Sequence, residues 1–253
     1  MPAMPEKSAL VTGASSGIGA AIARRLARDG YRVMAAGRDI GRTQALASES
    51  DRIQAWVGEL SMSGDCGRLV ADCAAAFGGL DVLVNNAGIY VPGSAEETSD
   101  RVWQETLTVN LSVPFYLCRA ALPLLRARKG AIVNIASNWG LGAGQRAVAY
   151  CASKGGLVLL SKALTVDHAA EGIRINAICP GDVDTPMLFR DAMARGLDRE
   201  TVLRESAAST RSGRVTTPEQ VAGLVAYLAS PEAAQINGET ILMDGGSMAG
   251  AGS

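Results

Sequence analysis

Three side chains that can exchange or position protons fall within one short segment, residues 137–154. Ser137 carries a hydroxyl, Tyr150 a phenol and Lys154 an amine. Tyr150 and Lys154 are four residues apart and would share one face of a helix. An ammonium beside a phenol favours the phenolate, so we expect Lys154 to lower the pKa of Tyr150 from its ordinary value near ~10. A phenol tuned in this way can take a proton from an alcohol or give one to a carbonyl.

The elements that flank this segment decide its interpretation, because a Tyr and a Lys at this spacing also fit an ordinary surface helix. Residues 131–137 (AIVNIAS) are mostly apolar and predict a buried strand that ends at Ser137. From Ala149 onward, apolar residues recur at helical spacing. The hydroxyl would therefore lie at the end of a strand, and the phenol and the amine at the start of the next helix.

A glycine-rich turn follows the first predicted strand, residues 7–11 (KSALV). The turn reads TGASSGIG and leads into an amphipathic helical pattern that ends at Gly30. Strand, glycine turn and helix form the context of a dinucleotide-binding turn, where the backbone approaches the pyrophosphate and the helix N-terminus attracts its charge. The residues expected to contact a cofactor here are Gly13, Ser15, Ser16, Gly17, Ile18 and Gly19.

The end of the second predicted strand, residues 31–38 (YRVMAAGR), bears on the type of cofactor. An acidic residue there binds the ribose 2′-hydroxyl of NAD, whereas an arginine suits the 2′-phosphate of NADP. Gly37 occupies the acidic position and Arg38 follows it. Alternatively, Arg38 is a surface residue and Asp39 binds the ribose. The pattern favours NADP(H), with NAD(H) possible.

Strand and helix patterns alternate along the whole chain, without a linker or an internal repeat. Further strands are predicted at 52–60, 80–88, 172–181 and 237–246, and further helices at 40–50, 63–77, 98–128 with a break near Pro114, 149–172 and 216–230. The alternation predicts one α/β domain over residues 1–253, with a doubly wound parallel sheet of about seven strands and helices on both faces. The long connection at about 182–212 is expected to be a substrate lid.

Composition argues against several other classes of protein. The 253 residues carry a net charge of −1 without a basic block, so no nucleic-acid surface is expected. One histidine and five cysteines without a CxxC pair predict no metal site and fit a reducing cytoplasm. The first residues lack the features of a signal peptide, and no apolar run is expected to span a bilayer, so no membrane partner is predicted.

Together these motifs resemble those of the short-chain dehydrogenase/reductase family, of the compact kind with a single Rossmann-type domain. The resemblance covers residues 7–246 and rests on TGASSGIG, NNAG (85–88), Asn110, Ser137, YCASK (150–154) and the Pro180-Gly181 pair. It implies an NAD(P)-dependent oxidoreductase that interconverts a secondary alcohol and a ketone by hydride transfer without a metal. It also implies a homotetramer, built by pairing long helices and the C-terminal helix and strand.

The resemblance implies a role for each matched residue. Tyr150 would be the general acid/base, Lys154 would lower its pKa and hold the nicotinamide ribose, and Ser137 would orient the substrate oxygen. Asn110 would hold a water in a proton relay to Lys154. The further cofactor-binding residues that it implies are Glu59, Leu60, Asn86, Ala87, Gly88, Pro180, Gly181, Val183 and Thr185.

Two positions depart from the family pattern. Glu59 stands where an Asp usually contacts the adenine, and Ser16 stands where NADP-preferring members often carry a basic residue. Arg38 is then the only phosphate anchor visible in the sequence.

The substrate pocket is expected to be walled by Ser137, Asn138, Trp139, Gln145, Arg146, Tyr150 and Asp182. These largely polar residues favour a small polar substrate such as a sugar or a hydroxy acid. One alternative is a 3-oxoacyl thioester reductase, for which Arg190, Arg195, Arg199 and Arg204 would supply a basic rim. A non-catalytic dinucleotide sensor is a further alternative, although such a protein would be expected to lose the Tyr or the Lys.

Overall fold

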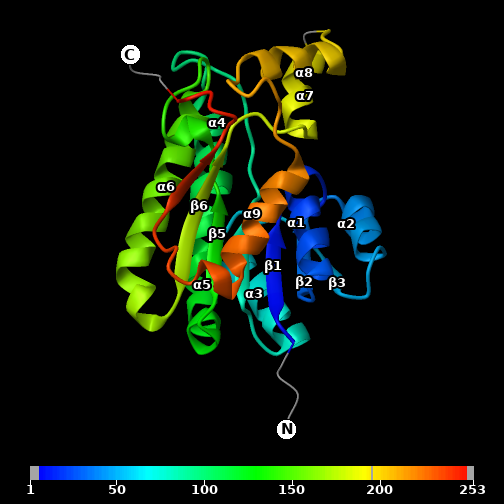
Figure 1. Cartoon of the computed structure of the whole chain (residues 1–253), viewed down its shortest axis with the longest axis vertical. Helices are drawn as coiled ribbons and strands as arrows, with labels where there is room; N and C mark the ends of the chain where they lie inside the picture. Colours follow the sequence, from blue (N-terminus) through cyan, green and yellow to red (C-terminus); the bar gives the residue numbers. More distant parts are fainter. Residues whose placement is uncertain (1–5, 195, 250–253) are drawn as a thin grey trace.

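Seven parallel strands form the centre of the molecule, in the order β3-β2-β1-β4-β5-β6-β7 (Figure 1). The computed structural model describes residues 6–194 and 196–249. The strands are β1 (Ser8–Thr12), β2 (Arg32–Gly37), β3 (Ile53–Val57), β4 (Val82–Asn85), β5 (Ala131–Ile135), β6 (Arg174–Pro180) and β7 (Thr240–Met243). The order reverses between β1 and β4, and such a switch point opens a ligand crevice at the carboxyl ends of the strands. The predicted doubly wound sheet is confirmed.

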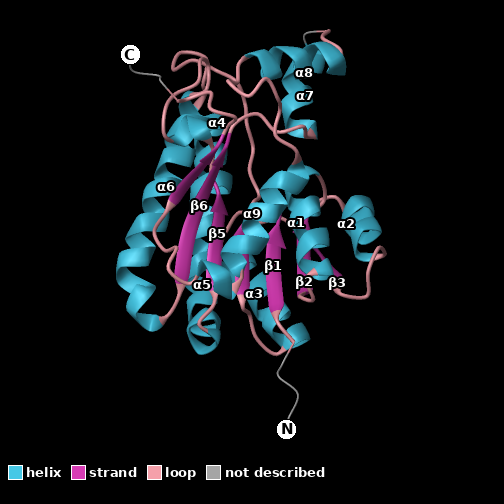
Figure 2. Ribbon diagram, in the orientation of Figure 1, coloured by secondary structure: helices cyan, strands magenta, loops and turns pink. Residues whose placement is uncertain are grey.

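Helices cover both faces of this sheet (Figure 2). One face packs against α1 (Gly17–Arg28) and α9 (Pro218–Ala229). The other packs against α3 (Ser63–Phe77), α5 (Val113–Arg128) and α6 (Val148–His168). Successive residues of the central strands alternate between these two apolar layers, and both layers are buried. This double burial explains why the strands read as continuous apolar runs in the sequence.

The long helical region after β4 is broken by a π-helical turn. It consists of α4 (Asp100–Leu107), the turn η1 (Thr108–Ser112) and α5. The break therefore lies just before Pro114 rather than at it. Pro114 occupies the first turn of α5, where a missing N–H costs no helical hydrogen bond of that helix.

The same region bears on the membrane prediction. By length and composition alone, the stretch Asp100–Arg128 could cross a bilayer, which corrects the expectation that no such run exists. Core helices pass the same test, and α5 contributes Leu117, Cys118 and Leu125 to the core, all fully buried.

The connection between β6 and α9 carries two short helices rather than an irregular loop. These are α7 (Pro186–Ala194) and α8 (Arg199–Ala208), and α2 (Ile40–Ala47) completes the set of α-helices within the described residues. Figure 1 shows α7 and α8 above the carboxyl ends of the strands. They form one side of the cavity described below, the place that the sequence assigns to a lid.

Candidate active site

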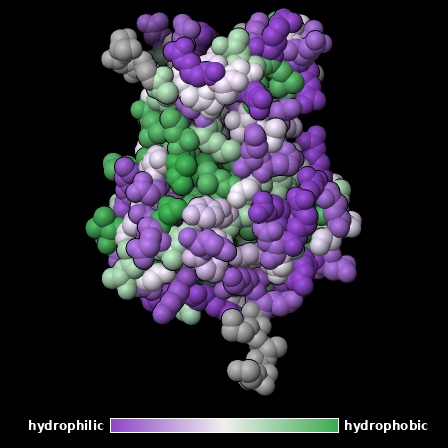
Figure 3. Space-filling view, viewed as in Figure 1, coloured by the Kyte–Doolittle hydropathy of each residue, from purple (hydrophilic) through white to green (hydrophobic). Residues whose placement is uncertain are grey.

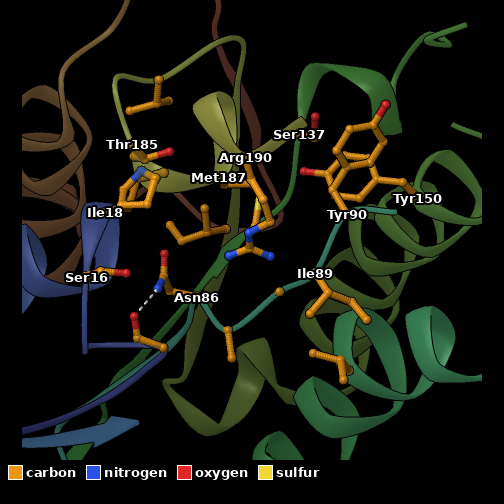
Figure 4. A pocket seen from close by; sticks show the side chains of 18 of the residues that line it. Ser16, Ile18, Asn86, Ile89, Tyr90, Ser137, Tyr150, Thr185, Met187 and Arg190 are labelled. Carbon is orange, nitrogen blue, oxygen red and sulfur yellow. Dashed lines mark hydrogen bonds between the residues drawn. The ribbon is translucent and has the colours of Figure 1, made fainter. Parts of the chain in front are cut away.

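A cavity of about 1150 Å³ opens at the carboxyl ends of the strands, below α7 and α8 (Figure 4). Its lining includes residues of the glycine-rich turn, the NNAG segment, the segment after β5 and the lid helices. Small-molecule sites usually have volumes of about 300–1,000 Å³. This cavity is therefore large enough for a dinucleotide together with a small substrate.

The glycine-rich turn has the shape and charge of a phosphate site. Gly13 has a φ of +64°, and a Cβ there would lie 2.9 Å from Ala87 Cα. The N-cap of α1, Ser16, makes no side-chain capping hydrogen bond, and the first turn of α1 has no acidic residue. The free N–H groups and the positive end of the helix dipole suit an anion. These features fit the pyrophosphate of a dinucleotide.

Gly19 plays a different part from the one expected. It does not line the cavity, and a Cβ at this position would collide with Gly13 O and Asn86 Nδ2. Gly19 thus lets α1 pack closely behind the turn, and the expectation of a cofactor contact is corrected.

Gly37 leaves no space for a carboxylate at the end of β2. A Cβ there would lie 2.5 Å from Thr43 Oγ1 and 3.1 Å from Ser15 Cβ. The acidic residue that binds a ribose in NAD sites is therefore excluded by packing at this position. Arg38 follows and lines the cavity, as the sequence predicts.

Asp39, the alternative ribose ligand, is engaged by its own helix. Its Oδ1 accepts a hydrogen bond from the backbone N–H of Arg42 at 3.0 Å and caps α2. Its Oδ2 lies 3.4 Å from the Arg42 guanidinium. Arg42 also lines the cavity, a second cation beside Arg38 that the sequence analysis missed. The sequence signal that could have identified Arg42 is its position three residues after Asp39, which caps α2.

Tyr150 and Ser137 meet at the far wall of the cavity (Figure 4). Ser137 ends the segment after β5 and caps the short helix η2 (Asn138–Gly140) by accepting from Trp139 N at 3.2 Å. Tyr150 lies in the first turn of α6. Burial raises the pKa of the Tyr150 phenol to about 12, although hydrogen bonding to Ser137 lowers it. The phenol is therefore in its neutral, proton-donating form at neutral pH.

Lys154 lies one turn further along α6 and is 4% exposed. Its Nζ donates to the carbonyl oxygen of Ile135 at 2.7 Å and lies 5.8 Å from the centre of the Tyr150 ring. Burial lowers the pKa of Lys154 to about 8. The expected lowering of the Tyr150 pKa is not found: burial is the largest cause of the shift, and it raises the pKa of this phenol.

Asn110 is fully buried in the π-helical turn. Its Oδ1 accepts from Ile89 N at 2.8 Å, and its Nδ2 donates to Ile89 O at 2.9 Å and to Ser153 Oγ at 3.0 Å. The side chain therefore ties the NNAG segment to α6. The expected water relay at this residue stays a prediction.

Aromatic rings surround the reactive phenol. Tyr90, Trp139 and Tyr150 contact one another edge to face, with ring centres 5.3–6.1 Å apart. Tyr90 lines the cavity, and the sequence analysis missed it. The sequence signal that could have identified Tyr90 is its position two residues after NNAG, a segment that was already expected at the site.

Two of the residues expected to wall the substrate pocket lie elsewhere. Gln145 and Arg146 are exposed and do not line the cavity. Arg146 instead pairs with Glu97 at 2.6 Å, and its backbone carbonyl accepts from Gly93 N at 2.7 Å. The expectation is corrected: this segment holds the loop after NNAG in place from outside.

The remaining predicted residues converge on the cavity. Glu59 and Leu60 do so from the loop beyond β3. This strand ends at Val57, whereas the sequence predicts a strand over residues 52–60. The others that line it are Ser15, Gly17, Ile18, Asn86, Ala87, Gly88, Asn138, Pro180, Gly181, Asp182, Val183 and Thr185. Within the described residues, no cluster of three or more His, Cys, Asp or Glu side chains could hold a metal ion.

Comparison with known proteins agrees with this geometry. A family model described as enoyl-(acyl carrier protein) reductase matches residues 13–248. The 2-keto-3-deoxy-L-fuconate dehydrogenase of Xanthomonas campestris is 37% identical over 243 residues, which are 95% of this chain and 79% of that protein. The chain belongs to the short-chain dehydrogenase/reductase family.

Other relatives of this dehydrogenase/reductase are similar over nearly their whole length. The meso-2,3-butanediol dehydrogenase of Serratia marcescens is 36% identical, over 97% of this chain and 96% of that protein. A crystal structure of the F189W actinorhodin polyketide ketoreductase with NADPH superimposes with a TM-score of 0.90 and 35% identity, covering 96% of this chain and 97% of that one. The protein is an oxidoreductase that acts on CH–OH groups and uses a nicotinamide dinucleotide.

Proposed function

We propose that this enzyme interconverts a small polar secondary alcohol and its ketone, with NADP(H) as the cofactor and Tyr150 as the general acid/base. The observation that carries the proposal is the meeting of the Tyr150 and Ser137 hydroxyls in the wall of a cavity that also contains a phosphate-binding turn. The four catalytic residues in this proposal are Asn110, Ser137, Tyr150 and Lys154.

The chain's own groups account for the movement of the proton. Ser137 hydrogen-bonds the substrate oxygen and orients it towards Tyr150. In reduction the neutral Tyr150 phenol donates its proton to that oxygen as charge develops there, and in oxidation the phenolate accepts the proton of the alcohol. The Lys154 ammonium stabilises the phenolate. The nicotinamide, when bound, supplies or accepts the hydride.

Polar side chains in the cavity wall near Tyr150 support a small polar substrate. Asn138, Asp182 and the phenol of Tyr90 line the cavity beside Tyr150. Relatives named for a deoxy sugar acid and for a butanediol have this substrate character. A 3-oxoacyl thioester is the second candidate, favoured by the similarity to a polyketide ketoreductase.

The basic rim that a carrier-bound thioester would need has little support. Arg199 pairs with Asp184 at 2.6 Å, and Arg204 lies 3.5 Å from Thr201 Oγ1. Arg195 lies outside the described residues.

The preference for NADP(H) rests on the end of β2. Packing around Gly37 excludes a carboxylate, the Asp39 carboxylate caps α2, and Arg38 and Arg42 line the cavity. Two guanidinium groups, of which Arg42 is paired with Asp39 at 3.4 Å, suit a 2′-phosphate better than a 2′-hydroxyl.

Initial rates over a panel of sugars, sugar acids, hydroxy acids and vicinal diols, each with NADP⁺ and NAD⁺, test both parts of the proposal. We expect oxidation of at least one secondary alcohol, with a KM for NADP⁺ at least about tenfold below that for NAD⁺. Changing both Arg38 and Arg42 to leucine should raise the KM for NADP⁺ by about tenfold to a hundredfold, since charge-assisted hydrogen bonds to phosphate are lost.

The same double variant should leave the KM for NAD⁺ nearly unchanged, and Arg68→Leu on the exposed surface of α3 serves as the control. Equal KM values for the two cofactors in the unchanged enzyme would contradict the NADP preference. Reduction of a short 3-oxoacyl thioester, with none of the polar alcohols oxidised, would favour the second candidate.

We propose that the enzyme is a homotetramer. Leu159 and Val166 on α6 are 68% and 84% exposed, and Leu242 on β7 is also exposed. Figure 3 shows a hydrophobic area over the part of the molecule where α6 and β6 are labelled in Figure 1. Light scattering should give about four times the 26.1 kDa chain mass, and Val166→Glu should give smaller species. A monomeric mass for the unchanged protein would contradict the proposal.

We also propose a cytoplasmic location. The five cysteines are all free thiols, and four of them are buried. Free thiols of this kind suit a reducing compartment.

A further inference from the structure

Arg190 on α7 enters the cavity from the lid side. Figure 4 shows its guanidinium turned into the cavity, with Ile18 and Asn86 on one side and Ser137 and Tyr150 on the other. The same residue lines the cavity. A guanidinium, whose N–H groups can only donate hydrogen bonds, therefore stands near the place where the hydroxyl and the phenol meet.

The other described arginines of the lid are engaged by protein groups. Arg199 pairs with Asp184 at 2.6 Å and lies over the Phe189 ring at 5.1 Å. Arg204 lies 3.5 Å from Thr201 Oγ1 and does not line the cavity. Among residues 6–194 and 196–249, Arg190 has no hydrogen bond or ion pair, so its donors are available to a ligand.

We propose that Arg190 binds the carboxylate of the substrate, so that the enzyme acts on a hydroxy acid and its oxo acid. This rests on the proposed function, in which Ser137 and Tyr150 hold the reacting oxygen of the same molecule. A guanidinium presents paired N–H groups that match the two oxygens of a carboxylate. The carboxylate at Arg190 and the hydroxyl at Tyr150 fix two ends of a short substrate, which sets its orientation.

The diphosphate of the cofactor is the other anion that could reach this cavity. The uncapped N-terminus of α1 already provides a site for it at the glycine-rich turn, and Arg38 and Arg42 stand at the end of β2. Asp182 and Glu205 also line the cavity and neither pairs with Arg190. These two carboxylates would repel a substrate carboxylate in other parts of the cavity. Arg190 is therefore the position at which we expect the substrate carboxylate to bind.

Calorimetric titration of the enzyme–NADPH complex with matched acids and amides tests the proposal. The probes are 3-hydroxybutyrate with 3-hydroxybutyramide, and gluconate with gluconamide. NADPH cannot accept a hydride, so these alcohols bind without reacting. We expect at least one acid to bind about tenfold or more tightly than its amide, because the acid gains charge-assisted hydrogen bonds.

Arg190→Met should remove this preference, Arg190→Lys should keep part of it, and Arg204→Met on the neighbouring helix should leave it unchanged. The Kd of NADPH should change less than about threefold in Arg190→Met. Equal binding of acid and amide by the unchanged enzyme, or a preference that survives Arg190→Met, would overturn the proposal. A rise in the NADPH Kd with the preference intact would assign Arg190 to the diphosphate. The experiment measures binding and not turnover. A failure of the carboxylate proposal can therefore be distinguished from a failure of the proposed catalytic function.

Discussion

Replacing Tyr150 by phenylalanine is expected to lower kcat by about a thousandfold in both directions. The variant keeps the ring contacts with Tyr90 and Trp139 but has no proton to give or take, and general acid–base catalysis contributes about 10²–10⁴ to the rate. Steady-state rates with the best alcohol and ketone of the panel are the measurement. The Kd of NADPH and the unfolding temperature should stay close to those of the unchanged enzyme.

Tyr90→Phe is the matched control for that variant. It removes a second phenol whose ring centre lies 5.3 Å from that of Tyr150, and we expect it to lower kcat less than about tenfold. A Tyr150→Phe enzyme that kept a tenth of its turnover, or a larger loss in Tyr90→Phe, would remove Tyr150 from the proposed role.

The pH dependence should differ between the two directions. Burial raises the pKa of Tyr150 to about 12, so the phenol is protonated at neutral pH. Reduction needs this protonated form and should be nearly constant from pH 6 to 8, whereas oxidation needs the phenolate and should become faster as the pH rises. An oxidation rate that fell over this range would argue against a phenol as the base.

The sequence predicts the fold and much of the site because their signals are local. Each strand is a short apolar run between turn residues, and the glycine-rich turn carries its function in its own backbone. Since the carboxyl ends of parallel strands meet at one edge, strand order alone brings Ser137, the NNAG segment and Pro180 together. The structure adds the distances and confirms the doubly wound sheet.

The errors concern quantities that depend on distant residues. Arg146 lies outside the pocket wall and pairs with Glu97, 49 positions away. The pKa of Tyr150 depends on how deeply the ring is buried, which a spacing of four residues on a helix does not specify. A Cβ at Gly37 would crowd the side chains of Thr43 and Ser15. The glycine that the sequence analysis interpreted as a sign of cofactor preference therefore also fits a packing requirement.

Replacing Lys154 by methionine is expected to lower kcat/KM for oxidation by at least about a hundredfold and to move its pH dependence upward. Lys154 Nζ lies 5.8 Å from the centre of the Tyr150 ring. An ammonium near a phenolate favours this charged form of the phenol. Removing the ammonium therefore makes the phenolate harder to form, whereas the neutral phenol that reduction requires is less affected.

The measurement is the pH profile of kcat/KM in both directions, with Lys162→Met, an exposed lysine on the same helix, as the control. Loss of the hydrogen bond to Ile135 O lowers the unfolding temperature but cannot by itself shift a pH profile. If the pH profile is unshifted and the cofactor binds more weakly, Lys154 acts by holding the nicotinamide ribose and not by lowering the pKa of Tyr150. A shifted profile would instead show that its field acts on the phenol even though burial sets the resting pKa of Tyr150 high.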